Sequence, residues 1–205
     1  ANCARPALWV VSDADTTIYL FGTIHTHDGR AHWFDHAVRR AFEASGTLVL
    51  ETLIPTQPVR VTAAEGSGLA IARDTLRSAE AAGLSARLGA DQVLARAASA
   101  AGKPMIGLES FDEQLRMYQS LPTPARPAAS TAAAAQAPPP EQGFTPTLRN
   151  LVDRWNQGDA RPIEAVVGAV RTQSPEAYRR LFTDRNAAWA KWIEARLEQP
   201  GTVFV

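Results

Sequence analysis

Short apolar runs separated by glycines or polar turns organise the first half of the chain. Residues 8–12 and 16–21 are two such runs on either side of a polar turn, and the second is rich in β-branched and aromatic side chains. This pattern predicts a β-hairpin. Residues 47–50 and 105–108 are continuous apolar runs, and each is followed directly by a glutamate. Continuous runs of this length are typical of buried strands.

Helical periodicity fills the segments between and after these runs. In residues 34–45, Val38 and Phe42 recur on one apolar face and Gly46 provides a helix end. Further helical segments are predicted at residues 69–101 (two or three helices), 110–121, 148–155, 162–171 and 175–198. The alternation of strands and helices predicts an α/β fold, with a mixed central sheet flanked by helices and a helical middle region.

Two segments interrupt or end this alternation. Residues 122–143 combine prolines with an alanine tract, which predicts a solvated loop within a single domain over residues 1–205. Residues 202–205 form a last apolar run, which predicts a strand at the very end of the chain. We expect this strand to be exposed, so that pairing with a second copy would give a homodimer.

Composition and charge narrow the class of protein. The 205 residues are 45% apolar and 20% charged, with a net charge of zero, which fits a globular protein and argues against nucleic-acid binding. No apolar run is long enough to span a membrane. The chain begins without methionine, from which we expect a removed signal peptide and a periplasmic or secreted protein, associated with a membrane or free. The single cysteine, Cys3, is either an inert thiol or paired outside the chain.

His25 is the first residue that could carry chemistry. It follows the end of a predicted strand and stands three residues after Gly22. Ligands of open α/β sheets bind outside the carboxyl ends of the strands, so this imidazole is a candidate metal ligand or base. A histidine on a surface loop is the alternative. His27, His32 and His36 match no HExxH motif, and we expect all three to face solvent.

Glu51 and Glu109 each end a continuous apolar run. A carboxylate at such a position is costly unless it pairs, binds a metal or meets water. Together with His25 the two glutamates would form a nitrogen and oxygen donor set suited to Mn, Co, Fe or Zn, with one carboxylate as general base. The alternative is that each strand simply opens into solvent, and the pattern does not decide between the two.

Arg185 lies between two helical stretches. It would either hold a buried carboxylate in a bidentate pair or take part in ordinary salt bridges on an exposed helix, and spacing alone favours the second. Trp155, Trp189 and Trp192 recur at helical spacing, and we expect them in the core rather than in a binding site.

Several motifs in this order resemble the TraB/PrgY/GumN family, whose relatives include the Tiki metalloproteases. The similarity is carried by residues 7–13, 18–25, 48–51, 103–109, 113–115, 155–159, 181–186 and 200–205. The family pattern has two GxxH motifs, and residues 22–25 match the first. The second would follow residue 205. The resemblance therefore implies that the chain ends before the second GxxH motif and lacks the family's C-terminal elements.

The resemblance implies a metal-dependent hydrolase with an architecture similar to erythromycin-esterase-like and ChaN-like proteins. The expected activity is that of a peptidase on peptide or protein substrates, with Mn or Co as the metal and Zn as a further option. His25 and Glu51 would bind the metal, and Glu51 or Glu109 would polarise the attacking water. Arg185 would stabilise the reacting group and, with Asn186, contact the substrate. Whether this chain is itself active stays open, and a non-catalytic protein that sequesters a peptide or pheromone signal is the alternative.

Overall fold

The computed structural model describes residues 4–55, 59, 61, 67–122 and 147–205. Cys3 and all but the first residue of the predicted loop 122–143 lie outside these ranges.

The described residues form five strands and a set of helices in the predicted alternation. The strands are β1 (Leu8–Ser12), β2 (Thr16–Phe21), β3 (Thr47–Thr52), β4 (Met105–Glu109) and β5 (Gly201–Phe204). The longer helices are α1 (His36–Ala44), α2 (Gly68–Ala81), α3 (Ala90–Ala100), α4 (Phe111–Ser120), α5 (Leu148–Trp155), α6 (Arg161–Gln173) and α8 (Asp184–Leu197). Shorter elements are the 3-10 turn η1 (Ala86–Leu88), the one-turn helix α7 (Pro175–Tyr178) and a π segment, η2 (Arg179–Thr183). The prediction of an α/β fold is confirmed.

The five strands form one mixed sheet in the order β1-β2-β5-β3-β4. β1 and β2 form the predicted antiparallel hairpin, and all other neighbours are parallel. The last strand lies in the middle: Val203 pairs with Ile18 on one side and with Thr47 on the other. The expectation of an exposed terminal strand is therefore wrong, because β5 is hydrogen-bonded along both edges and its apolar side chains need cover on both faces of the sheet.

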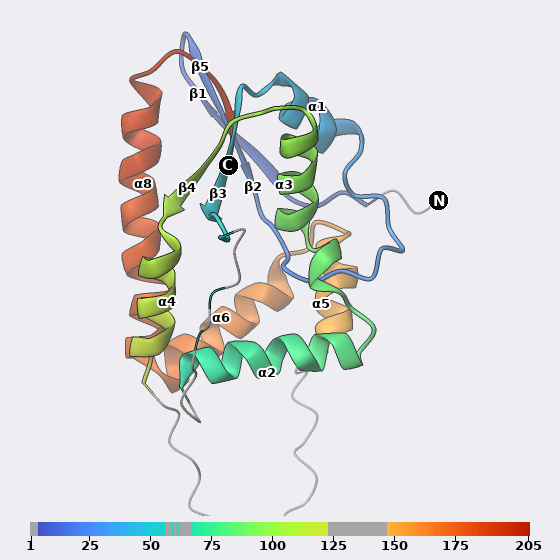
Figure 1. Cartoon of the computed structure of the whole chain (residues 1–205), viewed down its shortest axis with the longest axis vertical. Coiled ribbons are helices and arrows are strands. Elements are labelled where there is room, and N and C mark those ends of the chain that lie inside the picture. The colour runs from blue at the N-terminus through green and yellow to red at the C-terminus, as the bar shows by residue number, and fades with distance from the viewer. Residues whose placement is uncertain (1–3, 56–58, 60, 62–66, 123–146) are drawn as a thin grey trace, which may run out of the picture.

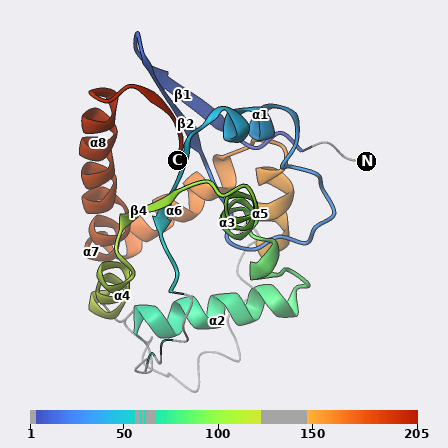
Figure 2. The ribbon, with the colours of Figure 1, turned by 45° about the horizontal axis from the view of Figure 1, so that its top comes forward.

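The sheet is covered by α8 on one face and by α1 and α3 on the other, as both views show (Figures 1 and 2). Alternate strand residues point to opposite faces, which divides the core into two clusters. On the α8 face, Ile18, Val49 and Val203 pack against the partly buried Trp192 and Ile193. The other face carries the larger, aromatic cluster.

Aromatic rings fill the core beneath α1 and α3. Phe204 is fully buried, and its ring centroid lies 5.7 Å from that of Phe21 and 5.9 Å from that of Phe42. Phe21 in turn stacks on Trp33 at 5.6 Å and meets Trp155 edge-on at 5.9 Å. The prediction that Trp155 is a core residue is confirmed.

Further helices lie beyond the carboxyl ends of β3 and β4, where α2 and α6 run across the lower part of the molecule (Figure 1). A small cluster of Ala79, Leu84 and Val152 connects α2 to α5 and packs against Ile24, which follows β2. α4 begins with a capping box in which Ser110 and Glu113 exchange hydrogen bonds with each other's backbone. Among the described helices, none has the length and apolar character needed to cross a membrane.

Phe204 tests the central position of β5. We expect Phe204→Ala to lower the free energy of unfolding by roughly 3–5 kcal/mol, because the cavity opens where both halves of the sheet meet. Val10→Ala, on the exposed part of β1, is the control and should change the value by about 0.5 kcal/mol or less. Urea denaturation followed by circular dichroism measures both, and equal losses would contradict the central placement.

Candidate functional site

The parallel strands bring the three acid and base candidates to one edge of the sheet. His25 follows β2, Glu51 lies near the end of β3, and Glu109 is the last residue of β4, where it pairs in register with Thr52. The carboxyl ends of parallel strands share one edge, so topology alone gathers these residues. Between β2 and β3 lies the end of β5, which separates the histidine from the glutamates by one strand.

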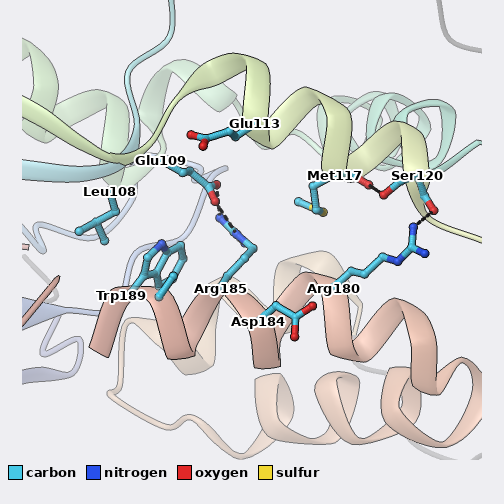
Figure 3. A pocket seen from close by; sticks show the side chains of 10 residues that line it. Leu108, Glu109, Glu113, Met117, Ser120, Arg180, Asp184, Arg185 and Trp189 are labelled. Carbon is cyan, nitrogen blue, oxygen red and sulfur yellow. Dashed lines mark hydrogen bonds and ion pairs between the residues drawn. The ribbon is translucent and has the colours of Figure 1, made fainter. Parts of the chain in front are cut away.

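Arg185 joins the two glutamates. Its Nη2 donates to Glu51 Oε2 at 2.7 Å and to Glu109 Oε1 at 2.7 Å, and its Nε donates to Glu109 Oε2 at 3.1 Å. Figure 3 shows Arg185 reaching from α8 towards Glu109, which lies just before the start of α4. The arginine thus forms a bidentate pair with Glu109 and a single hydrogen bond with Glu51. Of the two alternatives for Arg185, the structure shows the pair with a buried carboxylate and not the exposed helix surface.

The elements around Arg185 fix its side chain. It lies in the first turn of α8, directly after the π segment η2, a type of helix irregularity that occurs often at functional sites. The guanidinium stacks over the Trp189 ring at 4.5 Å and donates to the Leu181 carbonyl oxygen at 3.3 Å. Burial opposes its charge, but the hydrogen bonds and charges of Glu109 and Glu51 outweigh this and raise the pKa of Arg185.

The two glutamates differ in how tightly they are held. Glu109 is 14% exposed and accepts a further hydrogen bond from Gln114 Nε2 at 3.0 Å. Glu51 is 38% exposed, and within the described part of the chain its hydrogen bonding uses Oε2 alone. Within the described residues, one oxygen of Glu51 therefore has no hydrogen bond, whereas both oxygens of Glu109 are engaged.

A shallow groove borders this cluster between α4 and α8. Glu109 and Arg185 line one end, and Leu108, Met117 and Trp189 supply apolar walls (Figure 3). Trp189 was expected in the core, yet it is only half-buried and contributes to this wall. Asn186 is exposed next to Arg185 but is not among the residues that line the groove.

His25 belongs to the same region but contacts a different partner. Its ring is 64% exposed, and Nδ1 lies 3.6 Å from Asp91 Oδ1. Interaction with Asp91 raises the pKa of His25, with a smaller contribution in the same direction from the charge of Glu51. The influence of Glu51 places the imidazole within electrostatic range of the carboxylate cluster.

The described residues can be compared with the donors that a divalent metal requires. His25 and Glu51 are donors of the kind that Mn, Co or Zn accepts. In the ranges that the structure describes, no group of three or more His, Cys, Asp or Glu side chains is arranged to hold a metal ion. The two side chains are thus suited in kind to a divalent metal, but the described residues do not form a group of donors around one.

A buried histidine fixes the loop that carries His25. His27 was expected to face solvent, but it is 1% exposed, because Nδ1 accepts from Gly29 N at 2.9 Å and Nε2 lies 3.1 Å from Asn156 Oδ1. Since Nδ1 accepts, Nε2 carries the proton and donates to the amide oxygen. The expectation was wrong because both nitrogens find partners, one of them, Asn156, 129 positions away in the sequence. His32 and His36 are exposed, as predicted.

Residues 155–158 contact the loop after β2 and the segment before β1. Trp155 Nε1 donates to the Gly22 carbonyl oxygen at 2.7 Å, at the start of the GxxH motif. Arg5 N donates to the Asn156 carbonyl oxygen at 2.7 Å, and Gly158 has a positive φ of 72° with no room for a side chain against Arg5 O. The GxxH loop is therefore held by α5 and the turn that follows it.

The site also includes residues that the sequence pattern did not single out. Asn156 and Asp91 contact the two histidines after β2, and Tyr118 lies within electrostatic range of Arg185, Glu51 and Glu109. Burial raises the pKa of Tyr118, so its hydroxyl stays protonated near the carboxylates. Asn156 stood within one of the family motifs, which was the available signal, whereas Asp91 and Tyr118 stood in ordinary helical patterns.

This geometry defines an α/β protein with a Glu–Arg–Glu cluster and a histidine at the carboxyl edge of a mixed sheet. The model of the TraB/PrgY/gumN family matches residues 7–78 and 67–205, which is nearly the whole chain. The chain belongs to the TraB/PrgY/gumN family. Searches of curated proteins and of solved structures gave no significant match.

The contact between His27 and Asn156 predicts a measurable effect on stability. We expect Asn156→Ala to lower the free energy of unfolding by roughly 1–3 kcal/mol, because the buried Nε2–H of His27 loses its acceptor. Gln157→Ala, at the exposed neighbouring position, is the matched control. Equal stability of the two variants in urea denaturation would show that Asn156 does not hold the histidine.

The forked contact of Arg185 gives a second prediction. Arg185→Lys keeps the charge but cannot bond Glu51 and both oxygens of Glu109, so we expect a loss of roughly 1–3 kcal/mol in unfolding free energy. Arg161→Lys is the control, because Arg161 forms a comparable fork with Asp159 but is largely exposed. Its loss should be clearly smaller. The same denaturation experiment compares the two, and the reverse order would argue against the structural role of Arg185.

Proposed function

We propose that this protein is a metal-dependent hydrolase that acts on peptide or protein substrates, with its site at the carboxyl edge of the sheet. The observation that carries the proposal is the gathering of His25, Glu51, Glu109 and Arg185 from separate segments at this edge. Membership of the TraB/PrgY/gumN family supports it, since the family's resemblance to the Tiki metalloproteases implies this chemistry.

The two glutamates take different roles in this proposal. Glu51, the more exposed one, has an oxygen available to bind a metal or to accept a proton from the attacking water. Glu109 acts as a positioning residue, because its two oxygens hold the guanidinium of Arg185 in one orientation. This refines the expectation that either glutamate polarises the water.

Arg185 neutralises the carboxylates and directs hydrogen-bond donors towards the site. Its donors are engaged by Glu51 and Glu109. A substrate oxygen that develops negative charge would meet the guanidinium at the edge of the groove, on the side of Trp189. The apolar walls of the groove suit an apolar side chain of a peptide.

A divalent metal, Mn or Co with Zn as an alternative, would be held by His25 and Glu51. Their donor chemistry fits, and the remaining ligands would be water, substrate or groups outside the described residues. When bound, the metal would lower the pKa of a water ligand and polarise the scissile carbonyl. We further propose that the protein works outside the cytoplasm, in the periplasm or as a secreted protein.

A second function, peptide or signal binding without turnover, is favoured by one observation. The glutamates are paired with Arg185, and the described residues contain no three-donor metal group. A groove next to such a neutralised cluster could retain a peptide without cleaving it. The two functions differ in whether product forms.

Cleavage of a peptide library distinguishes these functions. We expect incubation with Mn or Co to give new peptide ends by mass spectrometry, and a chelator to abolish them. His25→Ala should reduce the rate at least about 100-fold, because it removes a metal ligand. His32→Ala, an exposed histidine of the same loop, should leave the rate unchanged.

Each other outcome of this experiment has a definite meaning. Peptides retained on the protein without product would support the binding function and overturn the hydrolase. Metal-dependent cleavage that persists in His25→Ala would show that the catalytic site lies elsewhere in the molecule. If the experiment gives no product and no retained peptide, both functions are overturned.

A further inference from the structure

Asp91 contains a buried oxygen without a hydrogen bond to any described residue. Asp91 lies in the first turn of α3, and its Oδ1 is inaccessible to solvent without a hydrogen-bond partner among the described residues. The other oxygen, Oδ2, receives a long hydrogen bond of 3.4 Å from Gln92. Leaving a buried polar atom unsatisfied costs about 1–3 kcal/mol, more for a charged group. A hydrogen-bond donor close to this oxygen would remove that cost, and His25 Nδ1 lies 3.6 Å away.

The backbone around Asp91 fixes it beside His25. Ala90 N donates to the Ile24 carbonyl oxygen at 2.8 Å, which joins the start of α3 to the residue before His25. Gly89 allows this approach: a Cβ there would lie 2.3 Å from the His25 carbonyl oxygen. α3 is itself packed into the aromatic core through Leu94 and Ala98. The carboxylate is therefore held by rigid structure, and the exposed imidazole is the group free to adjust.

We propose that Asp91 is the positioning residue of His25: its Oδ1 accepts the Nδ1–H hydrogen bond and leaves the lone pair of Nε2 directed into the site. A small rotation of the exposed ring shortens the 3.6 Å contact to hydrogen-bond length. The inference rests on the proposed function, because the hydrogen bond matters only if His25 acts as a metal ligand or base. An imidazole does so only through an unprotonated nitrogen. Carboxylates that hold the second nitrogen of such histidines fix both tautomer and ring orientation.

The alternative role for Asp91 is a favourable interaction with the positive end of α3. A carboxylate in the first turn of a helix is stabilising for that reason alone. That role does not depend on the protonated nitrogen of His25. The tautomer of His25 therefore separates the two roles, whereas a stability measurement does not.

Long-range ¹H–¹⁵N NMR of the histidine rings reads the tautomer directly. We expect the neutral form of His25 in the unmodified protein to carry its proton on Nδ1, with the signals assigned by their absence in His25→Ala. Asp91→Asn should shift His25 towards the Nε2–H form, because the amide can donate to Nδ1. Asp35→Asn, beside the exposed His36, is the matched control and should leave the His25 signals unchanged.

An Nε2–H tautomer of His25 in the unmodified protein would overturn the proposal, and this measurement requires no variant to fold. An unchanged tautomer in a folded Asp91→Asn protein, checked by circular dichroism, would also overturn it. If the protein binds Mn or Co, Asp91→Asn should weaken that binding about 10–100-fold, and Asp91→Glu should restore part of it. Absence of metal binding would count against the proposed function but not against the Asp91–His25 pair, because the NMR result stands independently.

Discussion

The insertion of β5 between β2 and β3 is the constraint on which the rest of the structure depends. Without this strand the sheet would consist of two separate pairs, β1 with β2 and β3 with β4. β5 has only four residues, yet it hydrogen-bonds along both edges, and Val203 and Phe204 belong to the cores on opposite faces. Its partners lie far away in the sequence, so both cores form only when the chain end has returned to the centre of the sheet.

The charged cluster depends on this arrangement and contributes to it. Arg185 stands on α8, which leads into β5, while its two carboxylate partners end β3 and β4. The ion pairs therefore connect the helix before the central strand to the strands beyond it. Partly buried ion pairs add little net stability compared with apolar contacts, because desolvation opposes them. The cluster therefore fixes the relative position of α8, β3 and β4 more than it adds to the free energy of unfolding.

Local sequence patterns were sufficient to predict the elements and the candidates for chemistry, but not the strand order. The apolar runs ending at Glu51 and Glu109 were clear because a buried strand followed by a charge is a local pattern. The central position of β5 is a property of pairing across the whole chain, and nothing in residues 202–205 distinguishes an edge strand from a central one. The prediction that His27 faces solvent was wrong for the same reason. Its burial depends on a contact with Asn156, which local spacing does not reveal. For Arg185 the spacing favours an exposed helix surface, because its partners Glu51 and Glu109 lie on strands far away in the sequence.

Two different devices fix the two sides of the candidate site. On the β2 side, packing and neutral hydrogen bonds hold the backbone around His25: α3 contacts it directly, and α5 holds the loop through Trp155. On the β3 and β4 side, ion pairs with Arg185 hold Glu51 and Glu109 in place. Neutral contacts are little affected by salt or pH, whereas partly exposed ion pairs respond to both. The backbone on the histidine side is thus held by contacts that salt and pH affect little, whereas the contacts of Glu51 are sensitive to both. The exposure of the two glutamates agrees with this, because the side chain of Glu51 is 38% exposed and that of Glu109 only 14%, so the pair with Glu51 is the one more open to solvent.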